Sequence, residues 1–135
     1  MENLYIEATP VTPYVFFNAE TSILEIKGRS SPDNSLEFYS AILNYIDEYY
    51  SNPVERLQIN VNLEYFNTSS LKCIFQMLKK LSDVSEDRSA VEVNWYYEED
   101  DEDMLETGED IADLLDLEFN FISDEEVPQP ALNKF

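Results

Sequence analysis

The pattern of apolar and polar positions predicts strands at several short segments of the chain. Residues 57–63 (Leu-Gln-Ile-Asn-Val-Asn-Leu) alternate between apolar and polar side chains, which is typical of a strand with one buried face. Residues 14–17 and 23–27 are also rich in apolar side chains and are joined by five residues, so we expect an antiparallel hairpin. Gly28 is expected to end its second strand. Further strands are expected at residues 90–97 and 117–121, and residues 4–7 are a candidate for one additional short strand, which is not counted in the order of elements below.

Apolar residues that recur every three or four positions predict three helices. We expect Ser31 to cap the first helix, Pro32 to occupy its first turn and Asn52-Pro53 to mark its end. The second helix follows Asn67, and a short third helix covers residues 111–115. The apolar positions of the first two helices are Leu36, Tyr39, Ile42, Leu43, Ile46 and Tyr49, and then Leu71, Ile74, Phe75, Leu78 and Leu81.

The resulting order of elements is β-β-α-β-α-β-α-β. This alternation predicts a single-domain α/β protein with a mixed β-sheet and helices packed on it, joined by right-handed crossovers. A chain of 135 residues fits one domain. We expect that domain to span residues 1–127 and a loose C-terminal tail to occupy residues 128–135.

The charge of the chain narrows the choice of partners. It carries 29 acidic and 8 basic residues, for a formal net charge of −21, and this sign repels nucleic-acid phosphates and anionic lipid surfaces. We therefore expect no nucleic-acid partner and no membrane partner, and instead proteins with basic patches or divalent cations. Nine Tyr, eight Phe and one Trp indicate a folded chain despite the charge.

The residue types that are missing bear on catalysis. The sequence contains no histidine and a single cysteine, Cys73, which excludes serine–histidine, cysteine–histidine and histidine–zinc sites within this chain and any internal disulfide. We expect a protein that is not an enzyme and needs no cofactor. The N-terminus lacks the features of a signal peptide and no apolar run approaches ~18 residues, so we expect a cytoplasmic location.

Segment 65–70 (Tyr-Phe-Asn-Thr-Ser-Ser) carries the first candidate chemistry. It lies between the clearest strand and the second helix, where open α/β sheets collect functional groups. Asn67 or Thr68 can serve merely as the N-cap of the helix, worth about 1 kcal/mol. Alternatively, three successive hydroxyls at a helix N-terminus can include a phosphorylation site, because the helix dipole stabilises an anion there.

Two other segments have both a structural and a functional interpretation. Residues 98–103 are all acidic; they can be a solvated loop and helix start, a docking surface for a basic partner, or a Mg²⁺ or Ca²⁺ site, although they lack the calcium-loop spacing. Segment 28–34 is either a turn with a helix cap or the place where Arg29 pairs with a phosphate or with the acidic loop.

Four segments of the chain together resemble the SiaC family of bacterial regulatory phosphoproteins. These are residues 28–34, 65–70, 95–103 and 108–110. The motifs occur in the family's order, and the similarity extends to about residue 123. This chain departs from the family at Ser31, where an aromatic residue is more usual, and at Asp33, which replaces Glu. A contact made by that aromatic residue would be lost.

The resemblance implies a fold related to anti-sigma-factor antagonists and a partner-switching role. A serine/threonine kinase of the histidine-kinase-like ATPase type would phosphorylate Thr68, and a metal-dependent serine/threonine phosphatase would reverse this. The unphosphorylated form would bind and activate a diguanylate cyclase that controls biofilm formation or aggregation. The residues then expected at partner interfaces are Tyr65, Asn67, Thr68, Ser69, Ser70, Arg29, Glu98, Asp100 and Asp101.

Two alternatives remain open from the sequence. The same phosphoswitch can act on an anti-sigma factor, since the discriminating residues lie in the partner. A metal enzyme built on the acidic residues 98–103, such as a hydrolase, is supported only by that carboxylate cluster and opposed by the missing histidine.

Overall fold

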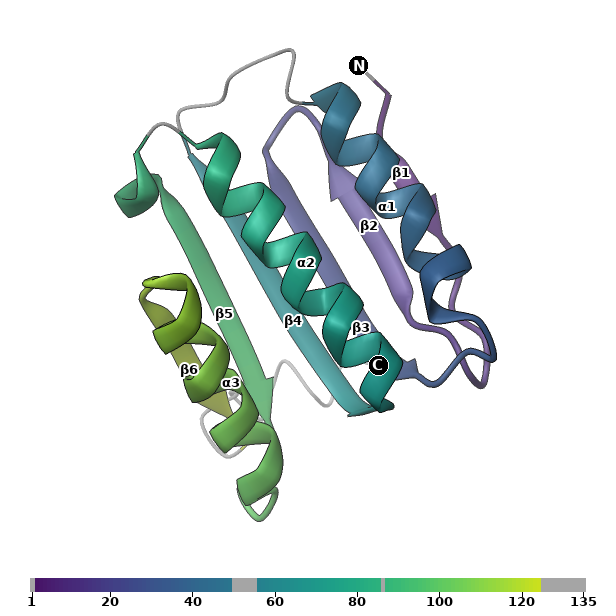
Figure 1. Ribbon diagram of the computed structural model, residues 1–135, viewed down its shortest axis with the longest axis vertical. Helices are drawn as coiled ribbons and strands as arrows, with labels where there is room; N and C mark the ends of the chain where they lie inside the picture. Colours follow the sequence, from purple (N-terminus) through teal and green to yellow (C-terminus); the bar gives the residue numbers. More distant parts are fainter. Residues whose placement is uncertain (1, 50–55, 86, 125–135) are drawn as a thin grey trace.

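The computed structural model describes residues 2–49, 56–85 and 87–124. These form one six-stranded sheet and three α-helices, as Figure 1 shows. The mixed α/β class predicted from the sequence is confirmed. The elements are β1 (Leu4–Ile6), β2 (Tyr14–Asn18), β3 (Ile23–Ser30), α1 (Ser35–Tyr49), β4 (Leu57–Phe66), α2 (Thr68–Val84), β5 (Val91–Tyr97), α3 (Glu102–Leu115) and β6 (Phe119–Ser123), with a short 3₁₀ turn at Arg88–Ala90.

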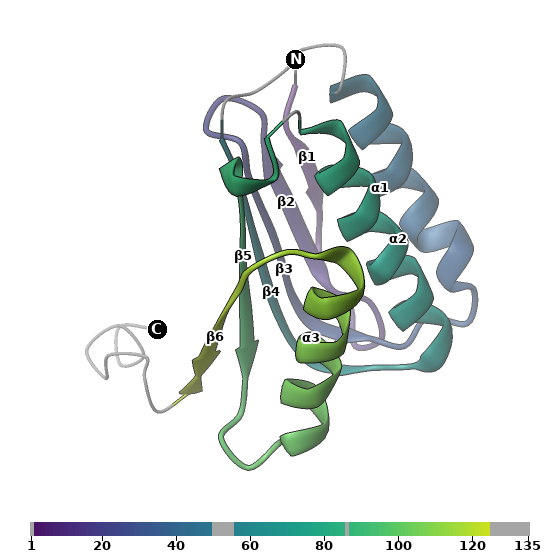
Figure 2. The same ribbon diagram turned by 60° about the vertical axis from the view of Figure 1, so that its left-hand side comes forward.

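The strands lie in the sheet in the order in which they occur in the chain. β1, β2 and β3 are antiparallel neighbours, which confirms the expected hairpin, whereas β3, β4, β5 and β6 are parallel. Because each crossover is a right-handed step in the same direction, the three crossover helices lie on one face of the sheet. Figure 2 shows α1, α2 and α3 on that face.

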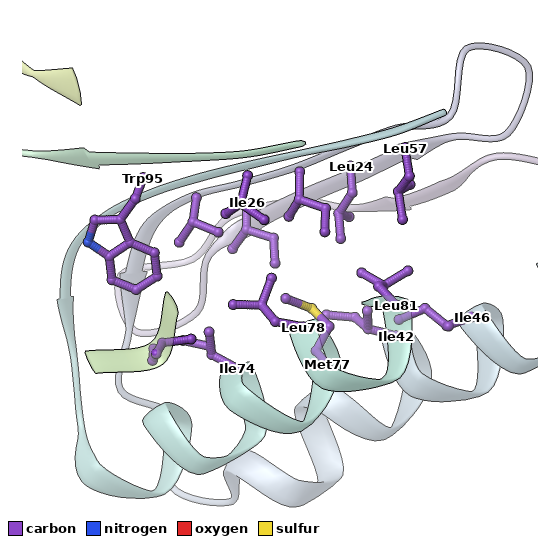
Figure 3. Packing of buried hydrophobic residues seen from close by; sticks show 14 of the residues in the cluster. Leu24, Ile26, Ile42, Ile46, Leu57, Ile74, Met77, Leu78, Leu81 and Trp95 are labelled. Atoms are coloured by element: carbon purple, nitrogen blue, oxygen red, sulfur yellow. The ribbon is translucent and has the colours of Figure 1, made fainter. Parts of the chain in front are cut away.

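The core fills the space between the sheet and the helices. Alternate strand residues point into it, as the period-two pattern predicted, and the opposing side chains come from the apolar stripes of α1 and α2. No other buried side chain is larger than Trp95. Figure 3 shows Leu24, Ile26 and Leu57 of the sheet facing Ile42, Ile46, Met77, Leu78 and Leu81 of the helices.

The face of the sheet without helices is polar on β4, β5 and β6. Asn60, Asn94 and Asn120 lie side by side in register. The Asn60 Oδ1 accepts from the Asn94 Nδ2 at 2.8 Å, and the Asn94 Oδ1 accepts from the Asn120 Nδ2 at 2.9 Å. These amide pairs explain the polar half of the alternation in 57–63.

Three expected boundaries were wrong or lie outside the described residues. α1 begins at Ser35, and the first turn is capped by Asn34, whose Oδ1 accepts from the Glu37 N–H at 3.1 Å. Ser31 instead donates its N–H to the Val11 carbonyl at 2.8 Å, which holds it in the preceding loop together with Pro32. The expected helix end at Asn52-Pro53 and the expected tail at residues 128–135 lie outside the described residues.

The prediction that Gly28 ends its strand was also wrong. β3 continues to Ser30, and Gly28 adopts φ +114°, a conformation that side chains disfavour. At this point the register with β4 shifts, so that Arg29 lies opposite Tyr65 and Ser30 opposite Phe66. Gly28 pairs with Leu63 and Arg29 with Tyr65, so the extra residue is Glu64 of β4, and Gly28 lies opposite this β-bulge.

The third helix is much longer than the predicted 111–115. α3 begins at Glu102, and Asp101 caps it by accepting from the Met104 N–H at 3.0 Å. The acidic residues at its start hid the helix from an analysis based on apolar spacing, although carboxylates are favourable at a helix N-terminus.

None of the helices in the described part of the chain combines the length and the apolar character needed to span a membrane.

The position of α3 depends on Trp95. The indole Nε1 donates to the Met104 carbonyl of α3 at 3.0 Å, and the ring lies directly against Gly108. A Cβ atom at Gly108 would be only 2.6 Å from the Trp95 Nε1. Gly108 therefore permits α3 to approach β5 closely enough for this hydrogen bond to form.

We predict that Gly108→Ala destabilises the protein by about 1–3 kcal/mol, because overpacking against the buried indole outweighs the higher helix propensity of alanine. Urea unfolding measures this change. Asp113→Ala, an exposed position in the same helix, is the control and should stay within about 0.5 kcal/mol of wild type. Equal or greater stability of Gly108→Ala would contradict the packing argument.

Candidate functional site

The three segments singled out from the sequence all follow the carboxyl ends of neighbouring parallel strands. Segment 28–34 spans the end of β3, segment 65–70 spans the end of β4, and residues 98–103 follow β5. The carboxyl ends of parallel strands meet at one edge of a sheet, and ligands and functional groups collect there. This shared edge is the candidate functional site.

Asn67 fixes the junction between β4 and α2. Its side-chain Oδ1 accepts from the Ser70 N–H at 2.9 Å, so it is the N-cap of α2. Its backbone N–H donates to the Ser30 carbonyl at 3.0 Å, and its Nδ2 donates to the Pro32 carbonyl at 3.4 Å. The helix start is thereby tied to the β3–α1 loop.

A cluster of hydroxyl groups lies directly beneath this junction. The Ser30 Oγ lies 2.7 Å from the Tyr39 hydroxyl and donates to the Ser70 Oγ at 2.9 Å. The Ser35 Oγ lies 3.1 Å from the Ser70 Oγ and 2.8 Å from the Ser69 Oγ. We call these five residues, Ser30, Ser35, Tyr39, Ser69 and Ser70, the hydroxyl cluster. It joins β3, α1 and α2 through side chains alone.

Thr68 is the first residue of α2 and stands apart from this cluster. Its side chain is exposed, and in the described part of the chain no hydrogen bond engages its hydroxyl. Ser70, in contrast, is fully buried, and Ser69 also donates to the Asn67 Oδ1 at 3.2 Å. Of the three successive hydroxyls, Thr68 is the one that faces solvent without a partner.

Burial sets the ionisation of the cluster. The pKa of the Tyr39 phenol is raised to about 12 by desolvation, and the hydrogen bond between its hydroxyl and Ser30 offsets only part of this increase. The phenol is therefore uncharged at neutral pH. Since the Ser30 hydroxyl donates to Ser70, it must accept from the Tyr39 hydroxyl. The hydrogen bonds therefore run from Tyr39 to Ser30 and from Ser30 to Ser70.

Arg29 and Tyr65 lie together on the helix-free face of the sheet. The Arg29 guanidinium carbon is 4.4 Å from the centre of the Tyr65 ring, within the range of a cation–π contact. Tyr65 is 43% exposed. Arg29 continues the alternation of β3, in which Ser30 is buried, and the extra residue Glu64 in β4 brings Tyr65 to the same face, so both side chains point away from the hydroxyl cluster. No carboxylate of the acidic loop forms an ion pair with Arg29 in the described residues.

The acidic residues form the turn that leads into α3. Glu98 and Asp100 are exposed, and Asp101 is the helix cap, with its N–H donating to the Glu98 carbonyl at 2.9 Å. Within the described residues, no three carboxylate or thiolate side chains are grouped in a way that could hold a metal ion. The turn places the carboxylates at the same edge of the sheet as Thr68, but among the described residues it does not bring them together around a common point.

The sequence analysis missed a groove between α2 and α3. It has a volume of about 620 Å³ and its lining is mostly apolar. Leu71 and Phe75, which were assigned to the apolar stripe of the second helix, line it only half-buried, and Leu114 of α3 is 73% exposed. We call this the α2/α3 groove. Its lining residues are Leu71, Lys72, Phe75, Gln76, Lys79, Thr107, Asp110, Ile111 and Leu114.

Comparison with known proteins defines the class of protein to which this fold and site belong. The family model described as SiaC family regulatory phosphoprotein matches residues 6–124. The chain belongs to this SiaC family of regulatory phosphoproteins.

Individual relatives agree with the family match. An uncharacterized protein of Pseudomonas aeruginosa (strain UCBPP-PA14) is 26% identical over 113 residues, which cover 84% of this chain and 90% of the relative. The crystal structure of apo-SiaC from Pseudomonas aeruginosa matches with a TM-score of 0.82 at 24% identity, covering 91% of this chain and 100% of that chain.

A crystal structure of the diguanylate cyclase SiaD in complex with its activator SiaC, also from Pseudomonas aeruginosa, contains a chain that matches with a TM-score of 0.81. The identity is 24%, and the match covers 89% of this chain and 98% of that chain. These structural matches establish that the fold is shared.

We predict that Tyr39 makes the stability of the protein fall at high pH. The folded-state pKa of about 12 exceeds the value of about 10 expected in the unfolded chain, so the protonated phenol stabilises the fold below pH 10 and this contribution is lost as the pH rises toward 12. Between pH 9 and 11 the wild type should lose about 1 kcal/mol more unfolding free energy than Tyr39→Phe.

Urea unfolding of both proteins at the two pH values checks this prediction. Tyr45 and Tyr49, whose pKa values are also raised mainly by burial, are present in both proteins, so their contributions cancel. Parallel pH profiles for wild type and Tyr39→Phe would contradict it.

Proposed function

We propose that this protein is a non-enzymatic signalling switch in cyclic-di-GMP control. In its unphosphorylated form it binds and activates a diguanylate cyclase, and phosphorylation of Thr68 releases the cyclase. The observation that carries the proposal is that Thr68 is an exposed hydroxyl without a hydrogen-bond partner among the described residues, at the edge of the sheet where the conspicuous motifs converge. Membership in a family of regulatory phosphoproteins supports it.

The hydroxyl cluster supports Thr68 over its two neighbours as the phosphoacceptor. The Ser70 hydroxyl oxygen is fully buried and lies within 3.1 Å of the hydroxyl oxygens of both Ser30 and Ser35. It would have to leave the hydroxyl cluster before a kinase could phosphorylate it. Ser69 would have to give up its 2.8 Å contact with Ser35. Thr68 can enter a kinase active site without breaking any hydrogen bond of the described residues.

A phosphate on Thr68 would oppose binding for electrostatic reasons. It would add roughly 1.5 to 2 negative charges at neutral pH to a chain that already carries −21. If the neutral hydroxyl lies inside the interface, the phosphate must also be desolvated there, which is costly without a paired cation. A penalty of about 2–3 kcal/mol corresponds to a loss of roughly 30- to 150-fold in affinity.

The proposed partners are two enzymes that change the phosphorylation state and one that responds to it. The phosphate is added by a serine/threonine kinase of the histidine-kinase-like ATPase type and removed by a metal-dependent serine/threonine phosphatase. The partner that responds is the cyclase, whose product promotes biofilm formation or aggregation. All of these contacts take place in the cytoplasm. The structurally similar SiaC of Pseudomonas aeruginosa is the activator of the diguanylate cyclase SiaD, which supports a cyclase as the partner that responds to the signal.

The interface in this proposal is built on the carboxyl edge of the parallel strands. Thr68 and Ser69 are exposed at its centre, and Asn67 and Ser70 hold them in place. The remaining proposed contact residues, which flank this centre on either side, are Arg29, Tyr65, Glu98, Asp100 and Asp101.

We predict that the cognate kinase transfers one phosphate to wild-type protein, and that Thr68→Ala abolishes the transfer because the other exposed hydroxyl at the start of α2, that of Ser69, is held by Ser35 and Asn67. Ser69→Ala should retain full phosphorylation and is the matched control. Intact-mass and fragment mass spectrometry report the extent and the position of the modification. Full phosphorylation of Thr68→Ala at Ser69 would overturn the assignment.

We predict that phosphorylated protein binds the cyclase roughly 30- to 150-fold more weakly than unphosphorylated protein, whereas Thr68→Ala binds like the unphosphorylated form. Calorimetric titration of the cyclase with the three proteins measures this difference. Equal affinity for all three would refute the switch. If affinity purification with Thr68→Ala recovers an anti-sigma factor and no cyclase, the partner that the switch controls is an anti-sigma factor.

A further inference from the structure

The α2/α3 groove combines an apolar floor with a cationic edge on α2 and one carboxylate, Asp110, on α3. Leu71 and Phe75 of α2 and Ile111 and Leu114 of α3 provide the apolar side chains, and Lys72 and Lys79 line the groove on the α2 side. Leu114 is 73% exposed, more than any other large apolar side chain of the described residues. In a protein with 29 acidic and 8 basic residues, two lysines beside one apolar groove are a notable concentration of positive charge.

The three lysines of α2 differ in their partners. Lys79 forms an ion pair with Asp83 at 3.1 Å, and Lys80 forms an ion pair with Asp47 of α1. Lys72 is exposed, and among the described residues no carboxylate lies within ion-pair distance of it. The cation of Lys72 is therefore available to a group that comes from outside or is added to the chain.

Lys72 lies four residues after Thr68 in the same helix. Side chains with this spacing are neighbours on the helix surface, and an acidic group that precedes a lysine by four residues has the favourable order for pairing. A phosphate on Thr68 would therefore lie next to the Lys72 ammonium group. The hydroxyl of unmodified Thr68 carries no charge and leaves that ammonium group free.

We propose that the α2/α3 groove holds an amphipathic, acidic segment of the diguanylate cyclase, and that Lys72 couples this groove to Thr68. This proposal rests on the function proposed above. The apolar side of the segment covers Leu71, Phe75, Ile111 and Leu114, and its carboxylates pair with Lys72. When Thr68 is phosphorylated, Lys72 pairs with the phosphate instead, and the groove loses its one uncommitted cation.

Charge complementarity determines this choice of occupant. A basic segment would meet Lys72 and Lys79 at the α2 edge, and like charges across an interface suppress binding. An uncharged segment would cover the floor but leave Lys72 without a partner. An apolar row with carboxylates on the side that faces α2, and none on the side that faces Asp110 of α3, satisfies both the floor and the edge, which is the arrangement of helix-in-groove recognition.

The pairing of Lys72 with the phosphate can be tested without the cyclase. Phosphothreonine is installed at position 68 by the kinase or, if the kinase fails, by genetic-code expansion, and its second pKa near 6 is followed by ³¹P NMR. A neighbouring cation favours the dianion, so this pKa should be lower in wild type than in Lys72→Gln by roughly half a unit.

Lys80→Gln, which removes the same charge from the same helix outside the groove lining, is the control and should leave the phosphate pKa at the wild-type value. Equal phosphate pKa values in wild type and Lys72→Gln would overturn the coupling.

The effect on the cyclase is measured as a cycle of four affinities, for wild type and Lys72→Gln with and without the phosphate. Lys72→Gln should weaken binding of the unphosphorylated protein roughly fivefold, the size of one ion pair of about 1 kcal/mol. It should not weaken binding of the phosphorylated protein further, because Lys72 has already left the groove. The same loss in both states would show that Lys72 acts independently of the phosphate and would overturn the proposal.

The groove itself is tested with an apolar position that is exposed and tolerant of change. Leu114→Glu should weaken binding of the unphosphorylated protein more than tenfold by placing a carboxylate in the apolar floor, with an unchanged urea midpoint. Ala41→Glu, an exposed position on α1, adds the same charge outside the groove and should bind like wild type. Wild-type affinity for Leu114→Glu would exclude the groove as the docking surface.

These outcomes separate this inference from the function on which it rests. If no form of the protein binds the cyclase, the proposed function fails, whereas the ³¹P measurement still decides whether Lys72 pairs with the phosphate. If the cyclase binds and responds to phosphorylation but ignores Leu114→Glu and Lys72→Gln, the proposed function stands and the groove proposal is wrong.

Discussion

The candidate functional site depends on one constraint: each buried hydroxyl at the carboxyl end of β3 needs a hydrogen-bond partner. Ser30, Ser35 and Ser70 are buried, and an unpaired buried hydroxyl costs roughly 1–3 kcal/mol. The three oxygens satisfy one another and Tyr39, which fixes the starts of α1 and α2 relative to the sheet. Thr68 takes no part in this pairing, so its chemical modification need not disturb the fold that presents it.

A second contact places the other wall of the α2/α3 groove. Trp95 holds α3 through the Met104 carbonyl, and Gly108 lets the helix approach the indole. α3 covers the outer strands β5 and β6 while α2 covers the inner ones, as Figures 1 and 2 show. The apolar groove lies between these two helices, and Leu114 is its most exposed apolar side chain.

The sequence predicted the elements whose apolar spacing is regular and missed those set by single polar contacts. Strand 57–63 and the second helix were found because their periods are clear, and Asn67 was recognised as a possible cap. The start of α1 was misplaced because Asn34 and Ser31 are both plausible caps, and only the loop contact of Ser31 with Val11 decides between them. The first half of α3 was missed because its acidic residues carry no apolar signal. At the site, hydroxyl spacing did not distinguish Thr68 from Ser69 and Ser70; their different burial arises from tertiary contacts with Ser30 and Ser35 that lie 34 to 40 residues away in the chain.

In the proposed switch, the distribution of positive charge gives a way for one phosphate to act on so acidic a protein. The charge of a phosphate acts mainly on groups close to it, because exposed charges farther apart than about 8–10 Å are largely screened in salt. A local exchange of partners avoids this problem. Among the described residues Lys79 and Lys80 form ion pairs with carboxylates of the fold and Lys72 forms none, so in the proposed switch the phosphate and the partner would compete for one cation within a single helical turn. The response then depends on short-range pairing, which salt screens far less than it screens the net charge of −21.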